Sequence, residues 1–151
     1  MINNYVYTIV SIADIHFGCN ESPIYMYEQL KLQFINKISN INFQILAICG
    51  DLFDSRFMGN NPAITYAIQF IDDLVQLCAV KNASLIILAG TLSHDSGQLS
   101  LFYHYMNRPD VDVRIIEKIQ FENIKKYYTS LEDMIYVYYM EHIKVLLKVA
   151  K

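Results

Sequence analysis

Hydrophobic residues occur along this chain in two alternating patterns. Short continuous apolar runs, typical of buried strands, cover residues 5–13, 43–49, 84–89 and 111–116. Between these runs, apolar positions recur at helical spacing and predict helices over residues 23–39, 62–80 and about 97–106. Asn61 and Pro62 are the residue types of an N-cap and a first-turn proline, so the second helix is predicted to begin there.

This order of strands and helices predicts an α/β fold with a largely parallel sheet covered by helices. The pattern changes after residue 118. Residues 119–140 predict two further strands around a polar turn, with no crossover helix between them. In the last segment Lys144, Lys148 and Lys151 share one helical face, which is typical of a solvated last turn.

The composition indicates one folded domain. The chain has 151 residues, of which 54% are apolar and 18% charged, so it is long and apolar enough to bury a core. No apolar run approaches the ~20 residues that span a bilayer. The N-terminus MINNYVYTIV lacks the basic start and cleavage site of a secretion signal. We therefore expect a cytoplasmic protein with no membrane partner.

Cysteine content and charge exclude two further classes. The three cysteines are an odd number without a C-x-x-C pair, so a disulfide framework or a cysteine zinc site is not expected. The net charge is −3, and no cluster of Lys and Arg provides the electrostatic footprint of a nucleic-acid-binding protein. Any binding of phosphate must therefore rely on another source of positive charge, such as a metal ion.

Potential metal ligands follow three of the predicted strands. The first strand is followed by ADIHFG with Asp14 and His16, the second by GDLFD with Asp51, and the third by AGTLSHD with His94. In extended backbone Asp14 and His16, two residues apart, would point the same way. The carboxyl ends of parallel strands meet at one edge, where open α/β sheets bind ligands. We therefore expect the three segments to converge there.

Each of these motifs alone is more often structural than functional. A D-x-H sequence arises by chance, a Gly-Asp pair after a strand is often a turn, and a lone histidine is commonly a hydrogen-bonded surface residue. Together they favour a metal site, because carboxylates gathered at one edge repel one another unless a cation lies between them. Mixed Asp and His ligands suit Mn, Fe or Zn better than Ca or Mg.

The order D-x-H, G-D-x-x-D and a third-strand glycine followed by His-Asp resembles the calcineurin-like metallophosphoesterase superfamily. DIHFG and GDLFD most resemble its SbcD-type DNA-repair exonuclease subunits, and GTLSHD followed by QL resembles their phage-encoded relatives. The resemblance covers about Tyr5 to Met140. It implies a metallophosphoesterase-like sandwich, with residues 1–140 as the N-terminal portion of that domain and residues 141–151 as a divergent tail.

The resemblance also implies roles for individual residues. Asp14 and His16 would ligate a first metal, and Asp51 would bridge two metals. Asp54 would hold the loop without itself contacting a metal. Ser93 stands where most of the superfamily has an asparagine ligand of the second metal, and is a poorer ligand.

His94 would act as proton donor, oriented by Asp95. The family continues to a further histidine and a Gly-His-x-His element that complete both metal shells, and neither has a counterpart in this chain. Of the remaining histidines, His104 is expected at the surface of its helix. The resemblance thus implies two divalent cations, with Mn expected and Fe or Zn as alternatives, but an incomplete second site.

Several functions agree with these observations. The first is a metal-dependent phosphodiesterase that acts on DNA, in the manner of a double-strand-break-repair exonuclease, with activity reduced by the absent ligands. A second is a phosphoesterase for a small phosphorylated substrate, and a third is a truncated, non-catalytic remnant or partner-binding module. A plain nucleotide-binding domain ranks last, because no G-x-x-x-x-G-K or G-x-G-x-x-G motif is present.

The resemblance further implies DNA and an SMC-like ATPase subunit as partners. The helix over residues 62–80 has an apolar stripe wider than one sheet face requires, centred on Phe70. The helix over residues 23–39 of the same chain could cover the surplus. Alternatively, the stripe could form a homodimer through the helices at about residues 25–39 and 62–80, as in the nucleases that the chain resembles.

Overall fold

The computed structural model describes residues 8–95, 97–117, 136–139 and 143–146. Its centre is a sheet of four parallel strands in the order β1-β2-β3-β4. The strands are β1 (Ile9–Ile12), β2 (Ile45–Cys49), β3 (Ser84–Leu88) and β4 (Val113–Ile116). The predicted α/β class with a parallel sheet and flanking helices is therefore confirmed.

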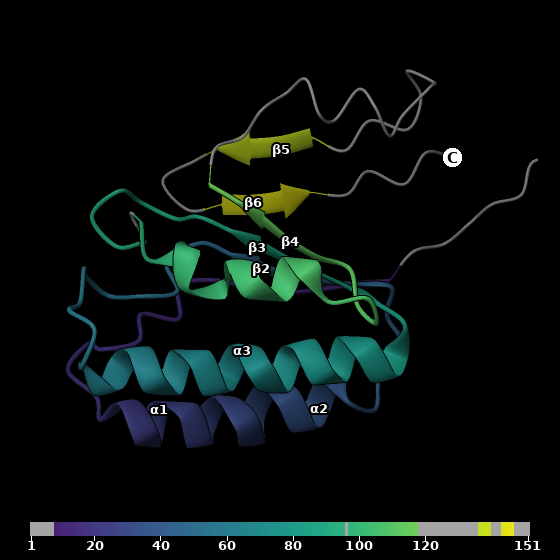
Figure 1. The fold of residues 1–151 in the computed structure, drawn as a ribbon. Coiled ribbons are helices and arrows are strands. Elements are labelled where there is room, and N and C mark those ends of the chain that lie inside the picture. Colours follow the sequence, from purple (N-terminus) through teal and green to yellow (C-terminus); the bar gives the residue numbers. More distant parts are fainter. Residues whose placement is uncertain (1–7, 96, 118–135, 140–142, 147–151) are drawn as a thin grey trace, which may run out of the picture.

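The helices follow the predicted order. They are α1 (Pro23–Leu30), the π-helical turn η1 (Lys31–Ile35), α2 (Asn36–Ile38), α3 (Pro62–Lys81) and the 3₁₀-helix η2 (Leu99–Asn107). Figure 1 shows α3 between the sheet and the α1–α2 layer, all on one side of the sheet. Consecutive right-handed crossovers between strands in sequential order place their helices on the same face, which explains this arrangement.

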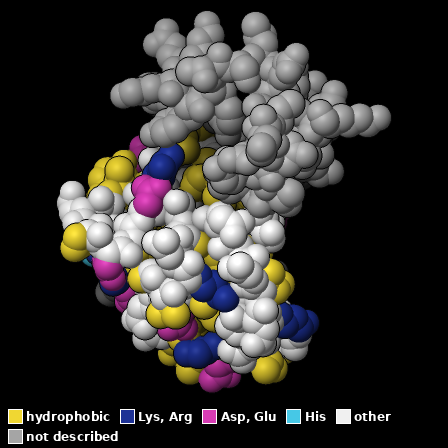
Figure 2. All heavy atoms as spheres, turned by 90° about the vertical axis from the view of Figure 1, so that its right-hand side faces the viewer, with side chains coloured by type: hydrophobic (Ala, Val, Ile, Leu, Met, Phe, Trp, Pro, Cys, Tyr) yellow, Lys and Arg dark blue, Asp and Glu magenta, His cyan; other side chains and the backbone are white. Residues whose placement is uncertain are grey.

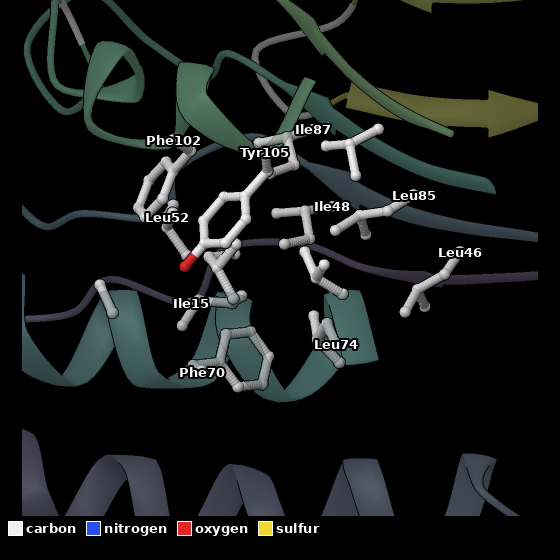
Figure 3. Close-up of a cluster of buried hydrophobic side chains, with 14 of the residues drawn as sticks. Ile15, Leu46, Ile48, Leu52, Phe70, Leu74, Leu85, Ile87, Phe102 and Tyr105 are labelled. Atoms are coloured by element: carbon white, nitrogen blue, oxygen red, sulfur yellow. The ribbon is translucent and has the colours of Figure 1, made fainter. Parts of the chain in front are cut away.

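The two central strands β2 and β3 are almost entirely apolar because both faces of the sheet are covered. Leu46, Ile48, Leu85 and Ile87 point towards the helices and are fully buried beside α3 (Figure 3). The alternate positions of the same strands form a second, smaller cluster on the other face, made by Ala47, Cys49 and Leu88 with Ile86 and Ile116. Sheets covered on both faces have continuous apolar runs in place of the alternating pattern.

Helix α3 begins where the sequence predicts. Pro62 is its first residue, and the side chain of Asn61 accepts a hydrogen bond of 2.8 Å from the N–H of Ala63. Among the described residues, α3 is the one helix long and apolar enough to span a membrane. Its buried face, however, packs between the sheet and α1, which accounts for its apolar composition. The predicted cytoplasmic location stays a prediction.

The apolar stripe of α3 is covered within the chain. Phe70, Ile71, Leu74 and Val75 are all 0% exposed. The sheet on one side and α1 on the other bury the Phe70-centred patch that was predicted to pair two copies. Cover by α1 of the same chain is one of the two alternatives that the sequence left open. The homodimer itself stays a prediction.

The third helical segment has a geometry that the sequence does not predict. It is a 3₁₀-helix, and its buried residues are Leu99, Phe102 and Tyr105. These side chains recur every three residues, which matches the three residues per turn of a 3₁₀-helix and places all of them on the side that packs into the core.

Near the C-terminus, β5 (Tyr136–Tyr139) and β6 (Ile143–Leu146) form an antiparallel pair. This pair lies on the sheet face opposite α3, with β6 in contact with β2 (Figure 1). β5 lies within the predicted strand region, whereas the other strand expected there falls at residues outside the described ones. The prediction of a helical turn around Lys144 is wrong, because Lys144 belongs to β6, which pairs with β5.

Candidate metal centre

The segments that follow β1 and β2 stay side by side beyond the sheet. The N–H of Asp14 donates to the carbonyl of Gly50 at 3.3 Å, and that of His16 donates to the carbonyl of Asp51 at 2.9 Å. From the segment after β3, the N–H of Thr91 donates to Oδ1 of Asp51 at 2.7 Å. The prediction that the three strand exits converge on one edge is therefore confirmed.

Three of the predicted site residues come together at this edge. The ligand atoms of His16, Asp51 and His94 all lie within 4.8 Å of one another. Nδ1 of His94 is 3.9 Å from Oδ1 of Asp51, and the rings of the two histidines lie 4.9 Å apart at 74°. Asp51 is 5% exposed, while both histidines are partly exposed, so the group opens to solvent on the histidine side.

The hydrogen bonding of this group fits a cation. Nδ1 of His16 and Nδ1 of His94 are buried, and neither has a hydrogen-bond partner among the described residues. Buried nitrogen atoms without partners are uncommon because they lose hydration without compensation. Two imidazole nitrogens beside a carboxylate form a ligand set suited to Zn, Mn or Fe, and a cation would satisfy all three. The group could therefore hold a metal ion.

The backbone at the site is strained. Asp14, His16 and Asp51 have φ values of +53°, +55° and +48°, in the left-handed region that costs an L-residue roughly 1 to 2 kcal/mol. The only other non-glycine residue of this kind within the described part is Asn82, which ends α3. Strain of this sort gathers at functional sites. The extended geometry expected for Asp14 and His16 is therefore wrong.

Asp14 and Ser93 lie at the edge of the site. Asp14 is exposed and is not among the three residues whose ligand atoms converge. Oγ of Ser93 is 3.2 Å from Oγ1 of Thr91, which in turn is 3.2 Å from Oδ1 of Asp51. Ser93 thus reaches the group through Thr91, and its expected ligation of a second metal stays a prediction.

Asp54 lies beside the first histidine. Its Oδ1 is 3.5 Å from Nδ1 of His16, and its side chain is 41% exposed. Asp54 is therefore the nearest carboxylate outside the group of three but makes no hydrogen bond to this nitrogen, and its supporting role stays a prediction.

Asp95 connects two loops of the site. The side chain is 2% exposed and accepts hydrogen bonds from the N–H groups of Leu52 (3.3 Å), Phe53 (3.1 Å) and Gly90 (2.8 Å). Burial raises the pKa of the Asp95 carboxyl, although these three bonds oppose the shift. Both carboxylate oxygens thus contact backbone, and Nδ1 of His94 has no hydrogen-bond partner in the described part of the chain, so the orientation of that ring by Asp95 stays a prediction.

Gln98 connects the same two loops, a role that the sequence does not indicate although QL after GTLSHD is part of the family resemblance. The residue is 6% exposed. Its Nε2 donates to the carbonyls of Ser55 (2.9 Å) and His94 (2.8 Å), and its Oε1 accepts from the N–H of Phe57 (2.8 Å). A lone glutamine before an apolar stretch carries no signal for such contacts, which depend on loops about 40 residues apart.

Gly90, the third-strand glycine of the family resemblance, shapes the site in a way that the sequence does not indicate. A Cβ atom at this position would lie 2.0 Å from Oδ1 and 2.2 Å from the backbone nitrogen of Asp51. Such distances are far below van der Waals contact. Only glycine at residue 90 therefore allows the segment after β3 to approach Asp51 so closely.

At the opposite edge of the sheet, the described residues form no comparable group of metal ligands. A surface hollow of about 420 Å³ lies there, lined in part by Arg108, Asp110 and Asp112. These charges are already matched, since Arg108 pairs with Asp110 and Arg114 with Asp112. Figure 2, which shows this side of the molecule, has Lys and Arg side chains interspersed with Asp and Glu. The hollow therefore offers no concentrated charge for a ligand.

Fold and site together define an α/β protein with a candidate metal centre at the carboxyl edge of its parallel sheet. No family model matches the chain, and no curated protein matches its sequence.

Proposed function

We propose that this chain is a divalent-metal-dependent phosphoesterase of the calcineurin-like metallophosphoesterase type. The observation that carries this proposal is the convergence of His16, Asp51 and His94, with both histidine Nδ1 atoms buried and without partners in the described part of the chain. The parallel sheet with helices on one face and a hairpin on the other agrees with one half of the sandwich that the family resemblance implies.

The preferred substrate in this proposal is the phosphodiester of DNA. Its support is the resemblance of DIHFG, GDLFD and GTLSHD to exonuclease subunits, from which an SMC-like ATPase partner also follows. The chain has a net charge of −3, so attraction of the phosphate would rely on the cation. When bound, the cation supplies Lewis-acid chemistry to the phosphate and makes a water molecule more acidic.

Manganese is the cation that we propose, with iron or zinc as alternatives, because the ligand set mixes imidazole and carboxylate. The resemblance implies a second cation. The described residues supply one group of three donors, and Asp14 is not part of it. For this reason we expect slow turnover.

Asp51 is the ligand with the best-defined position. Its Oδ1 accepts hydrogen bonds from the N–H and the hydroxyl of Thr91, at 2.7 and 3.2 Å. These bonds fix the carboxylate on the segment that also carries His94. Two alternatives remain in the proposal: a phosphoesterase for a small phosphorylated substrate, and a non-catalytic metal-binding module, which the small number of converging donors favours.

Cleavage assays with Mn²⁺ test this function. End-labelled double- and single-stranded DNA, bis-p-nitrophenyl phosphate and p-nitrophenyl phosphate separate nuclease, general diesterase and monoesterase activity. We expect slow, chelator-sensitive cleavage of DNA that Asp51→Asn abolishes. Asp110→Asn at the opposite edge serves as the matched control and should retain activity. Cleavage that survives Asp51→Asn or an excess of chelator would refute the proposal, and metal binding without any hydrolysis would favour the non-catalytic module.

A further inference from the structure

The surroundings of His94 differ from those of a proton donor. A histidine that transfers a proton at one ring nitrogen is usually oriented by an acceptor at the other. Among the described residues, Nδ1 of His94 has no hydrogen-bond partner, and the carboxylate of Asp95 is engaged with backbone N–H groups of other loops. The ring therefore lacks the hydrogen-bonded acceptor that usually orients a proton-donating histidine, and the nearest carboxylate oxygen, Oδ1 of Asp51, is 3.9 Å away.

The same nitrogen is placed as a metal ligand would be. We propose that His94 itself binds the cation, together with His16 and Asp51, in a centre for a single metal ion. This inference rests on the metal binding in the proposed function but not on DNA as the substrate. It assigns His94 a role different from the one that the family resemblance implies.

The distances in the group agree with one shared cation. Metal–ligand bonds of about 2.1 Å place two donor atoms on one ion roughly 3 Å apart when adjacent and about 4.2 Å apart when opposite. Nδ1 of His94 and Oδ1 of Asp51 are 3.9 Å apart, and the ligand atoms of all three residues lie within 4.8 Å. Because at most one pair of donors can be opposite on the same ion, the three side chains would have to approach one another by about 1 Å to share it.

The backbone of His94 is held in place for this role. Its N–H donates to the carbonyl of Thr91 at 3.1 Å, and its carbonyl accepts from Nε2 of Gln98 at 2.8 Å. Thr91 also binds Asp51, so the two ligands share one support. Ligands fixed in this way lose little freedom when a cation binds. Three protein ligands leave positions open for water or substrate, as in catalytic zinc sites and in the two-histidine, one-carboxylate iron sites.

Titration calorimetry of the whole chain with MnCl₂ alone tests the stoichiometry and the ligand role. We expect one Mn²⁺ per chain. His94→Gln and His16→Gln should each weaken binding at least tenfold, because each removes a ligand. His104→Gln is the matched control, since His104 is exposed and outside the group, and it should bind Mn²⁺ like the unaltered chain.

Pulsed electron paramagnetic resonance of the Mn²⁺-loaded chain gives a second readout that needs no variant. Coupling to the nitrogens of two imidazoles is expected, and only one should remain in His94→Gln. Two Mn²⁺ per chain, one imidazole in the unaltered chain, or full affinity in a folded His94→Gln variant would each overturn the inference while leaving metal-dependent hydrolysis intact. Absence of any Mn²⁺ binding would overturn it together with the proposed function.

Discussion

Asp51 owes its position to residues that are not themselves ligands. Its backbone is left-handed, with φ +48°, and its carboxylate lies against the backbone of Gly90 and Thr91. The sequence indicates Asp51 through the GDLFD motif after an apolar run. It does not indicate the strain or the close approach, because both depend on a neighbouring strand exit about 40 residues further along the chain.

Gly90→Ala is expected to destabilise the fold and disrupt the metal centre. The added methyl group would lie 2.0 Å from Oδ1 and 2.2 Å from the backbone nitrogen of Asp51, so the backbone itself must shift. Overpacking of this kind costs about 1 to 3 kcal/mol. We expect a loss of that size in the free energy of unfolding, measured by urea denaturation.

The same variant should bind Mn²⁺ more weakly by about tenfold or more, because Asp51 is displaced. Gly59→Ala is its control, since nothing lies within 4 Å of a Cβ atom at that position. Equal stability and equal Mn²⁺ affinity for the two variants would show that the segment after β3 adapts to the methyl group.

The three cysteines should differ in reactivity. Burial raises the pKa of the Cys49 thiol to about 11 and that of Cys78 to about 12, whereas Cys19 is partly exposed. Because the thiolate is the reactive form, a disulfide reagent at pH 8 should label Cys19 rapidly and the other two only after denaturation. Rapid labelling of all three thiols in the folded protein would contradict their burial.

These shifts also have a consequence for stability. The folded pKa values lie above the ordinary value of 9.0, so the unfolded chain loses these protons at lower pH than the folded chain does. The two thiols therefore favour the folded state below about pH 9 and lower its stability as the pH rises towards 11 and 12. Urea denaturation at pH 8 and pH 10 measures this decrease.

Between elements, the loops after β2 and β3 are joined mainly by side chains that contact backbone. Asp95 binds the N–H groups of Leu52 and Phe53, and Gln98 binds the backbone of Ser55 and Phe57. The periodicity of apolar residues predicts the strands and helices that bring these loops to one edge. It cannot predict bonds between loops, since they depend on tertiary approach rather than on local pattern.

Asp95→Asn tests the contribution of this connection. The amide retains one acceptor oxygen, but its NH₂ group would face N–H groups that now bind the second carboxylate oxygen. Leaving one buried donor without a partner costs about 1 to 3 kcal/mol. We expect a loss of that size in the free energy of unfolding, measured by urea denaturation. The control Asp110→Asn, at an exposed residue, should lose less than about 1 kcal/mol. Unchanged stability of Asp95→Asn would show that the loops hold together without this carboxylate.

For the whole molecule, the sequence predicts the parallel sheet and the order of its helices. It does so because apolar residues recur at helical spacing in each segment between two apolar runs. It predicts the segment after β4 less well. Lys144 has helical spacing with the later lysines, yet the residues around it pair as a strand with β5. A spacing shared by three residues is weak evidence beside the hydrogen bonding that an adjacent strand offers. Similarly, the width of the α3 stripe did not reveal that α1 covers it from within the chain.

Phe70 distinguishes a core helix from a dimer interface. It is 0% exposed and packs with Phe17, whose ring centre lies 5.9 Å away. Phe70→Ala should therefore cost about 3 to 5 kcal/mol of unfolding free energy. Because the contact is internal, the unfolding midpoint should not depend on protein concentration. The control Leu32→Ala, at a residue that is 55% exposed on η1, should lose far less.

Denaturation at protein concentrations a hundredfold apart, combined with light scattering, makes the comparison. A dimer held together by α3 would gain stability with concentration, since association favours the folded state by mass action. A midpoint that rises with concentration in the unaltered chain and ceases to do so in Phe70→Ala would restore the homodimer through α3. If the midpoint still rises with concentration in Phe70→Ala but no longer does so in Leu32→Ala, the contact between two copies would instead lie on the outer face of the α1–α2 layer. Ile24, Tyr25 and Leu32 are exposed on that face.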